Sequence, residues 1–338
     1  MQTDSMGLPA SSVATSAAAP TATPPASPAV GAPMASPGSP GPGLSRPSLA
    51  TVAELLKPIT WFPPMWAFTC GVVASGASVR EHWPQVILGV LLAGPLVCAA
   101  SQAVNDWFDR HVDAINQPER AIPSGRMPGR WGLYIAVLWT VLSLGVASLL
   151  GPVGFAAGVL GLVLAWAYSA PPVRLKENGW LGNAACGLSY EGLAWVTGGA
   201  VMMAGAIPDS RSLVLAGLYS LGAHGIMTLN DFKSVQGDRQ MGVRSLPVQL
   251  GINRAAHVAS WVMAVPQLVV IGLLIHWDQP LHAAAVGALL IAQAVLMRWF
   301  VAQPLKRALY YSGFGVPLFV SGMMVSAFAV RGLVGGGS

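Results

Sequence analysis

The feature that most constrains this fold is a succession of apolar stretches, each near 20 residues long, that begins at about residue 59. A helix of roughly 20 apolar residues spans the hydrocarbon core of a bilayer, which is about 30 Å thick. We therefore expect an all-α integral membrane protein with nine transmembrane helices. Their approximate ranges are 59–79, 84–104, 131–150, 152–170, 180–203, 212–230, 254–275, 281–300 and 309–330.

Charged side chains are scarce, which favours a membrane protein over a water-soluble one. The chain has 18 Lys and Arg and 13 Asp and Glu among 338 residues, so 9% of it is charged, against about 25% of a soluble domain. Its three Cys lie in apolar runs without metal-ligand spacing, which argues against a disulfide scaffold. A net charge of +5 is too thinly spread to indicate nucleic-acid binding.

Residues 1–50 differ in composition from the rest of the chain. They are rich in Pro, Ala and Ser, and their ten prolines disfavour any stable helix. They lack the basic and apolar regions of a signal peptide, and with one arginine they do not resemble a plastid transit peptide. We expect a disordered cytoplasmic tail over 1–50 and a nine-helix domain over 51–338.

Basic residues lie mostly on one side of the expected membrane domain. Nine helices divide the loops into two sets, with fifteen Lys and Arg on one side and three on the other. Because cytoplasmic loops carry the excess of Lys and Arg, we expect a cytoplasmic N-terminus and a periplasmic C-terminus. Without a transit peptide, the expected location is a bacterial inner (intracytoplasmic) membrane.

Charges of both signs gather in three of the expected cytoplasmic loops. Residues 105–130, 171–180 and 231–254 hold 17 of the 31 charged residues. A topological bias explains the arginines but not the aspartates, because acidic residues contribute little to orientation. The alternatives are ordinary solvated loops or a site at the membrane surface, and the aspartates favour the site.

The first acidic motif follows the second apolar stretch. It consists of Asn105, Asp106, Asp109 and Asp113. This spacing places three carboxylates on one helix face, where they repel one another unless something neutralises them. Arg110 and Arg120 would be the counter-ions of a solvated helix end. A hard divalent cation is the sharper interpretation, because Mg²⁺ takes a few carboxylates together with water and phosphate oxygens.

A second acidic motif ends the sixth apolar stretch. It consists of Asn230, Asp231 and Asp238, although Gly237 weakens a continuous helix between the aspartates. Two such motifs on one membrane face are expected to be halves of one site, with a diphosphate bridging two metals. Nearby basic residues that could bind its other oxygens are Arg120, Arg126, Lys176, Lys233 and Arg239. A purely topological role is an equal alternative for each.

A metal-bound diphosphate beside apolar helices suits a prenyl diphosphate. Its charged head would lie at the loops and its tail among the helices. Metal-assisted loss of the diphosphate would leave an allylic cation, which an acceptor attacks.

The first motif resembles the signature of the UbiA-type membrane prenyltransferases, and the second falls where that family has its second acidic motif. Further segments resemble the chlorophyll and bacteriochlorophyll synthase branch of the family. They are 114–116, 122–126, 168–172, 174–176, 178–180, 190–193, 229–233 and 237–251. The resemblance covers about 55–330. Gln117 and Gln236 stand where Glu is expected, which removes negative charge from both motif loops.

The resemblance implies nine helices around a lipid-accessible cavity with cytoplasmic cap loops. It implies Mg²⁺ as cofactor, with two ions, and transfer of a geranylgeranyl or phytyl group from its diphosphate to the propionate carboxylate of (bacterio)chlorophyllide a. By motif position, the three aspartates of the first motif would hold one metal, the two of the second motif would hold the other, and Asn105 and Asn230 would support them. The five basic residues named above would contact the diphosphate.

Four residues are candidates for the substrate pocket. They are Tyr168, Tyr190, Glu191 and His224. A carboxyl in mid-membrane, as expected for Glu191, is costly and marks a functional site by default. It could be a general base, although an ionised acceptor carboxylate needs none, and a structural hydrogen bond or a polar contact to the macrocycle accounts for it at least as well. His224 could bind the magnesium of a pigment or hydrogen-bond a neighbouring helix. The tyrosines could line the cavity or simply pack.

Two other functions compete with pigment synthesis on the same fold. One is prenyl transfer to a quinone or haem precursor, and the other is a non-catalytic pigment or lipid carrier. Transport predicts broken, polar mid-membrane segments in two matching halves, whereas the polar groups here crowd one face. The expected partners are the two substrates and the lipid bilayer. Pigment-assembly proteins are possible partners that no residue identifies.

Overall fold

The computed structural model describes residues 46–335, in which the regular elements are helices. The α-helices are α1 (Leu49–Leu56), α2 (Phe62–Ala74), α3 (Trp83–Leu91), α4 (Ala99–Asn116), α5 (Trp131–Ala147), α6 (Gly151–Ser169), α7 (Gly179–Gly187), α8 (Ala194–Met202), α9 (Ser210–Asp231), α10 (Val235–Gln240), α11 (Leu246–Leu250), α12 (Ile252–His276), α13 (Pro280–Ala302) and α14 (Pro304–Gly335). Short 3₁₀ turns are η1 (Pro58–Thr60) and η3 (Leu175–Glu177). Residues 1–45 of the expected tail lie outside the described residues, and its last two positions, 49 and 50, begin α1.

Within the described residues, six helices are long and apolar enough to cross a membrane. The all-helical membrane class is therefore confirmed. The three other expected spans fall on shorter or interrupted helices, namely α2, α5 and the run from α7 to α8. The expected second span, 84–104, ends too early, because the helical run from Trp83 continues to Asn116 and carries the first acidic motif on its last three turns.

Two of the long helical runs contain a π-helical segment. The segment η2 (Leu92–Cys98) joins α3 to α4, and η4 (Leu188–Leu193) joins α7 to α8. Pro95 lies inside η2, where its missing N–H removes one backbone donor from the regular ladder. Such segments insert an extra residue into a turn and occur often at functional sites. Both line the cavity described below.

Small residues hold the helices around these segments together. Gly71 on α2 packs so closely against α8 that an added Cβ would overlap the Trp195 carbonyl oxygen. Helices in lipid associate through such close backbone approach, since lipid provides little hydrophobic driving force. Trp195 stacks on Tyr219, whose ring meets Phe319 edge to face at 5.4 Å between centroids. A bulky side chain at Gly71 would separate α2 from α8 and so disturb η4.

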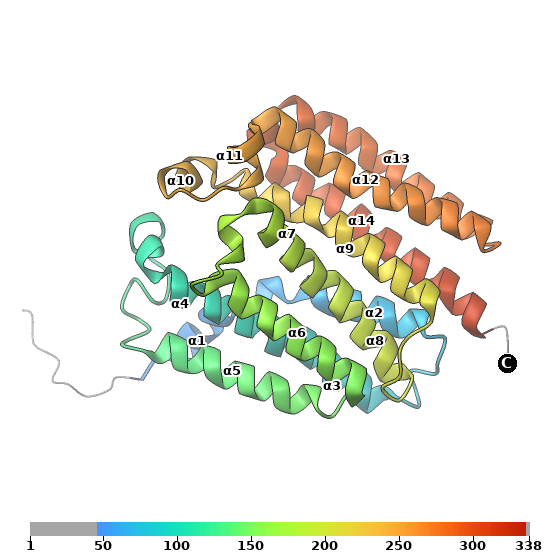
Figure 1. The fold of residues 1–338 in the computed structure, drawn as a ribbon, viewed down its shortest axis with the longest axis horizontal. Helices are drawn as coiled ribbons and strands as arrows, with labels where there is room; N and C mark the ends of the chain where they lie inside the picture. The colour runs from blue at the N-terminus through green and yellow to red at the C-terminus, as the bar shows by residue number, and fades with distance from the viewer. Residues whose placement is uncertain (1–45, 336–338) are drawn as a thin grey trace, which may run out of the picture. The chain divides into compact units, whose positions relative to one another are not determined.

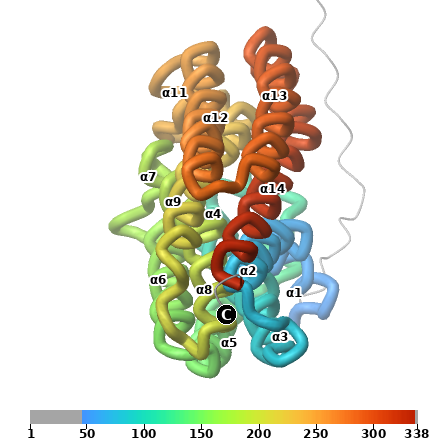
Figure 2. The backbone as a smooth tube through the Cα atoms, turned by 90° about the vertical axis from the view of Figure 1, so that its right-hand side faces the viewer, coloured from blue at the N-terminus to red at the C-terminus, as the bar shows by residue number. Residues whose placement is uncertain are grey.

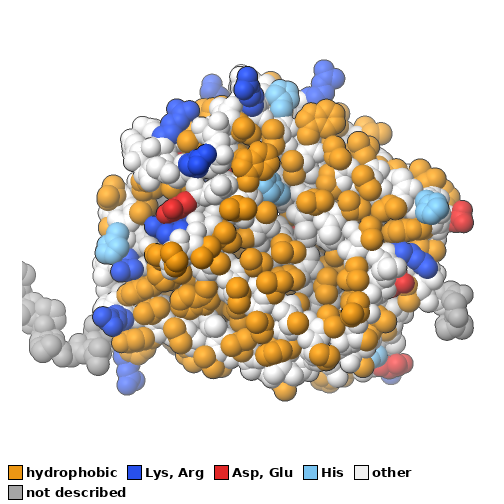
Figure 3. All heavy atoms as spheres, viewed as in Figure 1, with side chains coloured by type: hydrophobic (Ala, Val, Ile, Leu, Met, Phe, Trp, Pro, Cys, Tyr) orange, Lys and Arg blue, Asp and Glu red, His pale blue; other side chains and the backbone are white. Residues whose placement is uncertain are grey.

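The polar connections gather at one end of the helices. In Figure 1, residues 117–130 and helices α10 and α11 project from the left-hand end, where α4 ends and α7 begins. Figure 2, turned by 90°, shows the long helices arranged side by side about α9 and α14. Figure 3 shows hydrophobic side chains across the middle of the face in view and most Lys and Arg along its left and upper edges. We call residues 117–130, 170–178 and 232–251 the charged end.

Candidate active site

An apolar cavity of about 780 Å³ opens among these helices. Helices α2, α4, α6, α7, α9 and α14 contribute to its wall, together with both π-helical segments. The asparagines of the two acidic motifs, Asn105 and Asn230, both line it. The cavity therefore joins the two motifs, although 125 positions separate their asparagines in the chain.

The three aspartates of the first motif lie on α4, as their spacing predicts, and each is paired with a cation. Asp106 and Asp113 are buried. The Lys57 Nζ lies 2.6 Å from Asp106 Oδ1. The Arg120 Nη1 lies 2.7 Å from Asp113 Oδ2 and 3.4 Å from Asp106 Oδ1, so Arg120 bridges two carboxylates. The predicted repulsion between like charges is thus offset by side chains from two other segments.

The third aspartate, Asp109, faces the loop that follows α6. Lys176 forms an ion pair with its Oδ1, and the Arg174 Nη2 lies 3.6 Å from the same oxygen. Burial lowers the pKa of Lys176 below its ordinary value, although Asp109 opposes the shift. Lys176 is therefore a partly desolvated cation, held against the motif by a carboxylate.

The second motif is built differently. Helix α9 ends at Asp231, and Asp238 lies on the separate helix α10, so the expected i, i+7 relation does not run along one helix. Asp231 Oδ2 accepts a hydrogen bond of 3.1 Å from Asn183 Nδ2, and Asp238 Oδ2 accepts one of 2.9 Å from Ser234 Oγ. Within the described residues, neither aspartate forms an ion pair.

Contacts at the charged end tie the two motifs together. The Asn116 Nδ2 at the end of α4 lies 3.7 Å from the Met241 sulfur just after α10. Arg244 N donates to the Glu177 carbonyl at 2.9 Å, and Gly179 N donates to the Arg244 carbonyl at 2.8 Å. The segment that presents Lys176 is therefore bonded to the segment that follows the second motif.

The other predicted basic residues are placed less centrally. Arg126 is exposed and paired with Glu54, and its Nη2 donates to the Glu119 carbonyl at 2.6 Å. Arg126 also holds the pKa of Glu54 below its usual value by hydrogen bonding. The Lys233 Nζ lies 3.5 Å from Asn230 Oδ1, and Arg239 is an exposed residue of α10. Of the predicted basic residues, Arg120 and Lys176 are thus the two that contact motif aspartates.

The predicted pocket residues divide into two groups. Tyr168, Tyr190 and Glu191 line the cavity. The Tyr190 hydroxyl lies 3.2 Å from Gln102 Nε2 and 3.3 Å from Ser101 Oγ, both on α4. His224 is not among the lining residues; its Nε2 lies 3.2 Å from the Trp180 carbonyl oxygen and its ring packs against the Trp180 indole. The structure thus places His224 as a helix–helix contact.

Several residues that contact the motifs were not predicted. They are Lys57, Arg174, Ser169, Asn183 and Ser234. Ser169 accepts a hydrogen bond of 3.2 Å from Asn105 Nδ2. Lys57 carried a weak signal, because it directly precedes an apolar stretch on the basic side, but a topological role accounted for it fully. The others are polar residues in or beside apolar helices, where sequence does not reveal what they face.

Comparison with known proteins identifies the family of the chain. The model of the UbiA prenyltransferase family matches residues 64–321, which is more than half of the chain. The chain belongs to the UbiA prenyltransferase family. Relatives within this family are similar over most of their length.

The bacteriochlorophyll synthase 33 kDa chain of Cereibacter sphaeroides is 57% identical over 289 residues, 86% of this chain and 95% of that protein. Its counterpart in Rhodobacter capsulatus is 52% identical, over 85% of this chain and 95% of that protein. A chloroplastic chlorophyll synthase of Oryza sativa is 39% identical, over 82% of this chain and 75% of that protein.

Solved structures share the fold at lower identity. A digeranylgeranylglyceryl phosphate synthase superposes with a TM-score of 0.65 at 19% identity, covering 83% of this chain and 98% of that one. A UbiA homologue from Archaeoglobus fulgidus bound to GPP and Mg²⁺ gives a TM-score of 0.57 at 19% identity, covering 83% and 99%. These similarities support the helical architecture of the family.

The acidic motifs suit a hard divalent cation by the chemistry of their donors. Their ligands would be carboxylate and amide oxygens, which Mg²⁺ prefers. In residues 46–335, no three His, Cys, Asp or Glu side chains converge closely enough to hold a metal alone. This matches Mg²⁺ as well, since that ion keeps several waters and is usually bound by one or two carboxylates together with substrate phosphates. The residues present therefore fit the ion in combination with a diphosphate.

Proposed function

We propose that this protein transfers a prenyl group, geranylgeranyl or phytyl, from its diphosphate to the propionate carboxylate of a (bacterio)chlorophyllide. The observation that supports this most is the meeting of two Asn-Asp motifs at one apolar cavity. The names of the similar proteins, bacteriochlorophyll and chlorophyll synthases, support a tetrapyrrole acceptor. Prenyl transfer to a quinone or haem precursor is the weaker alternative, because no observation on the site favours it.

The cavity and the motifs suit the two ends of a prenyl diphosphate. The diphosphate would lie between α4 and α10 at the charged end, where Arg120, Lys176 and Lys233 can neutralise its oxygens. The prenyl tail would extend along the apolar wall, past Cys98 and Val97. Transfer of its hydrocarbon surface from water into this wall supplies binding free energy in proportion to the area buried.

The reaction exchanges one carbon–oxygen bond for another. The bond between the allylic carbon and the diphosphate breaks, and the electron pair leaves with the diphosphate. A carboxylate oxygen of the acceptor then forms the ester bond, so the attacking group needs no base. Arg120 and Lys176 stabilise the charge that develops on the leaving oxygens. The apolar wall excludes water, which would otherwise capture the allylic cation as an alcohol.

The metal sites follow the motifs. One ion would be held at the first motif by one or two of Asp106, Asp109 and Asp113 together with the diphosphate, and a second at Asp231 and Asp238. Bound Mg²⁺ would supply Lewis-acid stabilisation of the leaving diphosphate. The homologue from Archaeoglobus fulgidus in complex with GPP and Mg²⁺ supports this use of the fold. Lys57, Lys176 and Arg120 now neutralise the first carboxylates, so metal binding would release these cations toward the phosphate oxygens.

The orientation in the membrane is a proposal that the charge asymmetry supports. We place nine spans in a bacterial inner membrane, with the charged end acting as a cytoplasmic cap and the C-terminus in the periplasm. Single cysteines at Ser124 and Ala206, both exposed, test this. A membrane-impermeant thiol reagent should label the first in inverted vesicles and the second in intact spheroplasts. The reverse pattern would contradict the orientation.

The function is tested by assaying membranes that contain the protein with Mg²⁺, bacteriochlorophyllide a and geranylgeranyl diphosphate. We expect the esterified pigment as product, together with diphosphate, and none when EDTA replaces Mg²⁺. If no pigment is esterified while 4-hydroxybenzoate becomes prenylated, the acceptor assignment is wrong. Uptake of pigment without ester formation would support the carrier alternative instead.

A further inference from the structure

Glu191 is the one ionisable carboxyl among the described residues that line the cavity. The residue is 5% exposed, and its Oε2 is buried without a hydrogen-bond partner. None of the ion pairs in residues 46–335 includes it. A buried polar atom without a partner costs free energy, and native structures contain few of them. The arrangement therefore indicates that something absent from the chain itself pairs with this group.

The backbone holds Glu191 in a fixed position. Glu191 lies in the π-helical segment η4, between Gly187 and Gly192. A Cβ on Gly187 would lie 2.6 Å from the Ser220 carbonyl oxygen of α9, and a Cβ on Gly192 would overlap the Ser220 hydroxyl. On its other side, the neighbouring Tyr190 hydroxyl is fixed by Ser101 and Gln102 of α4. Because η4 is clamped between α4 and α9, Glu191 cannot easily turn away to find a partner.

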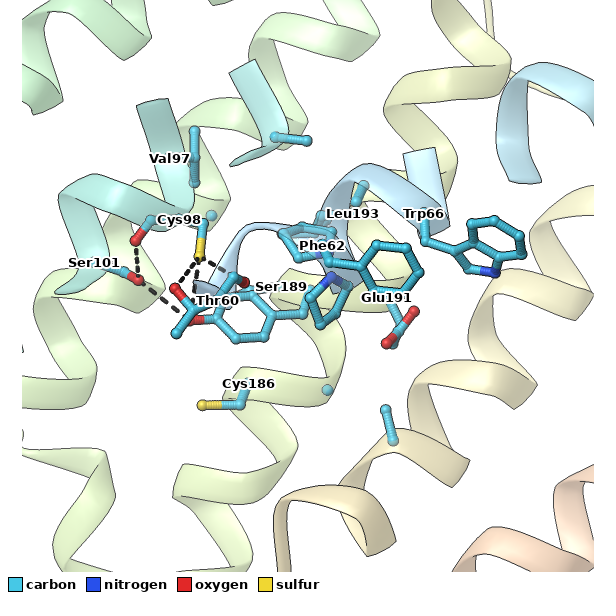
Figure 4. Close-up of a pocket in the computed structure, with 18 of the residues that line it drawn as sticks. Thr60, Phe62, Trp66, Val97, Cys98, Ser101, Cys186, Ser189, Glu191 and Leu193 are labelled. Atoms are coloured by element: carbon cyan, nitrogen blue, oxygen red, sulfur yellow. Dashed lines mark hydrogen bonds between the residues drawn. The ribbon is translucent and has the colours of Figure 1, made fainter. Parts of the chain in front are cut away.

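The position of Glu191 is distant from the acidic motifs. It lies twelve residues after Gly179, where α7 begins at the charged end, which is a helical rise of roughly 18 Å. Figure 4 shows its carboxyl on the same side of the pocket as Phe62 and Trp66. The hydrogen-bonded group of Thr60, Cys98 and Ser101 lies on the other side. Glu191 therefore meets a part of a substrate far from the reacting carbon.

The chemistry of the two substrates decides which of them Glu191 meets. An isolated carboxylate without a counter-ion is strongly disfavoured at this burial, so the group is a neutral acid with an O–H to donate. A prenyl tail is pure hydrocarbon and offers no acceptor. A tetrapyrrole carries carbonyl oxygens at the ring edge. They are uncharged hydrogen-bond acceptors, unlike the propionate carboxylate that reacts. We propose that Glu191 donates a hydrogen bond to a ring carbonyl of the pigment and so positions the macrocycle in the membrane.

This inference rests on the proposed function and is tested by pigment binding, without turnover. Purified protein in nanodiscs is titrated with bacteriochlorophyllide a, followed by pigment fluorescence, for the wild type, Glu191→Gln and Glu191→Leu. An amide still donates a hydrogen bond, so Gln should bind within about twofold of wild type, whereas Leu should lose roughly 10-fold in affinity. The affinity of both variants for geranylgeranyl diphosphate should stay unchanged.

Two further measurements separate positioning from structure and from metal ligation. Removing an unpaired buried carboxyl should leave the thermal midpoint of Glu191→Leu equal or higher; a lower midpoint would indicate a structural role and overturn the proposal. The metal-free pigment should show the same ratio of wild-type to Leu affinity, because the ring carbonyls remain. Loss of that ratio would assign Glu191 to the central magnesium instead.

The outcomes also separate this inference from the function on which it rests. If the wild type binds and esterifies the pigment while Glu191→Leu binds it equally well, the inference is wrong and the function stands. If the wild type neither binds nor esterifies the pigment, both are wrong.

Discussion

The two acidic motifs meet the same cavity but are neutralised in different ways. In the first, Asp106, Asp109 and Asp113 are each paired with Lys or Arg from outside α4. In the second, Asp231 and Asp238 accept hydrogen bonds from neutral donors, among them Asn183 and Ser234, and form no ion pair within residues 46–335. A carboxylate with a neutral partner retains most of its attraction for a cation. The first motif is therefore stable before a metal arrives, and the second is the half that a metal would change most.

The largest expected effect comes from removing a first-motif carboxylate. Asp109→Ala should reduce turnover by at least about 100-fold, because a charge that stabilises the leaving diphosphate complex is lost. Insertion into the membrane should be unaffected. Glu177→Gln is a matched control, because Glu177 is an exposed carboxylate that, like Asp109, forms an ion pair with Arg174. Comparable activity of Asp109→Ala and wild type would mean that α4 is not the metal site.

The second prediction sharpens the difference between the motifs through their metal dependence. Asn183→Ala removes the amide that orients Asp231, so the Mg²⁺ concentration for half-maximal activity should rise about 10-fold. Lys57→Met should leave that concentration equal or lower, because Lys57 competes with a metal for Asp106. If both variants shift this Mg²⁺ concentration in the same direction and by the same factor, the two motifs do not differ in their response to the metal. The measurement is a Mg²⁺ titration of the esterification rate.

The third prediction concerns stability without metal. Lys57→Met leaves the buried Asp106 with only the longer contact to Arg120. The free energy of unfolding should fall by about 1–3 kcal/mol, since an under-compensated buried charge is costly and Lys57 is partly exposed. Added Mg²⁺ and pyrophosphate should restore part of the thermal midpoint. Lys233→Met, which breaks no ion pair, should change the thermal midpoint little. If Lys233→Met lowers the midpoint as much as Lys57→Met does, the loss does not come from the broken pair of Lys57 and Asp106.

The smallest effect is expected at the exposed pair of Glu54 and Arg126. Glu54→Gln should cost about 0.2–1 kcal/mol, as is usual for surface ion pairs. Because Arg126 lowers the pKa of Glu54, this stabilisation exists above the ordinary carboxyl pKa and is lost as the pH falls through the lowered value. The thermal midpoints of the variant and wild type should therefore converge on acidification. If Arg126→Ala instead raises the KM for prenyl diphosphate about 10-fold or more, Arg126 leaves Glu54 for the substrate.

Sequence alone predicted the parts of the site that depend on local geometry. The i, i+3, i+7 spacing placed the first three aspartates on one helix face, and α4 bears this out. Gly237 indicated a weakened helix between Asp231 and Asp238 but not the place of the break, because the turn over Phe232–Ser234 depends on how α10 packs at the charged end. Lys57 and Asn183 reach their aspartates across 49 and 48 residues of chain, a distance that only tertiary packing closes.

The sequence predicted the fold class and most helix positions. It predicted the lengths of the helices less well and did not predict the π-helical segments. Apolar length predicted helices, but it could not show that α2 and α5 are short or that α4 runs on to Asn116. The π-helical segments have the same apolar composition as the α-helices beside them, so hydropathy cannot reveal them. Pro95 was the one local sign of η2, and a proline at such a position can equally mark a simple kink in an α-helix.

Each π-helical segment also adds to the length of the chain. Each holds one residue more than an α-helical turn would need. Deleting a single residue from η4, such as Ser189, would close the bulge into a regular α-helix, while the turns before and after it keep their orientation because the bulge already absorbs the extra residue. Gly198 would therefore keep its contact with the Phe68 carbonyl of α2. A relative that builds this stretch as a plain α-helix should therefore show a one-residue gap in alignment within 188–193, together with small residues at the same positions of α8.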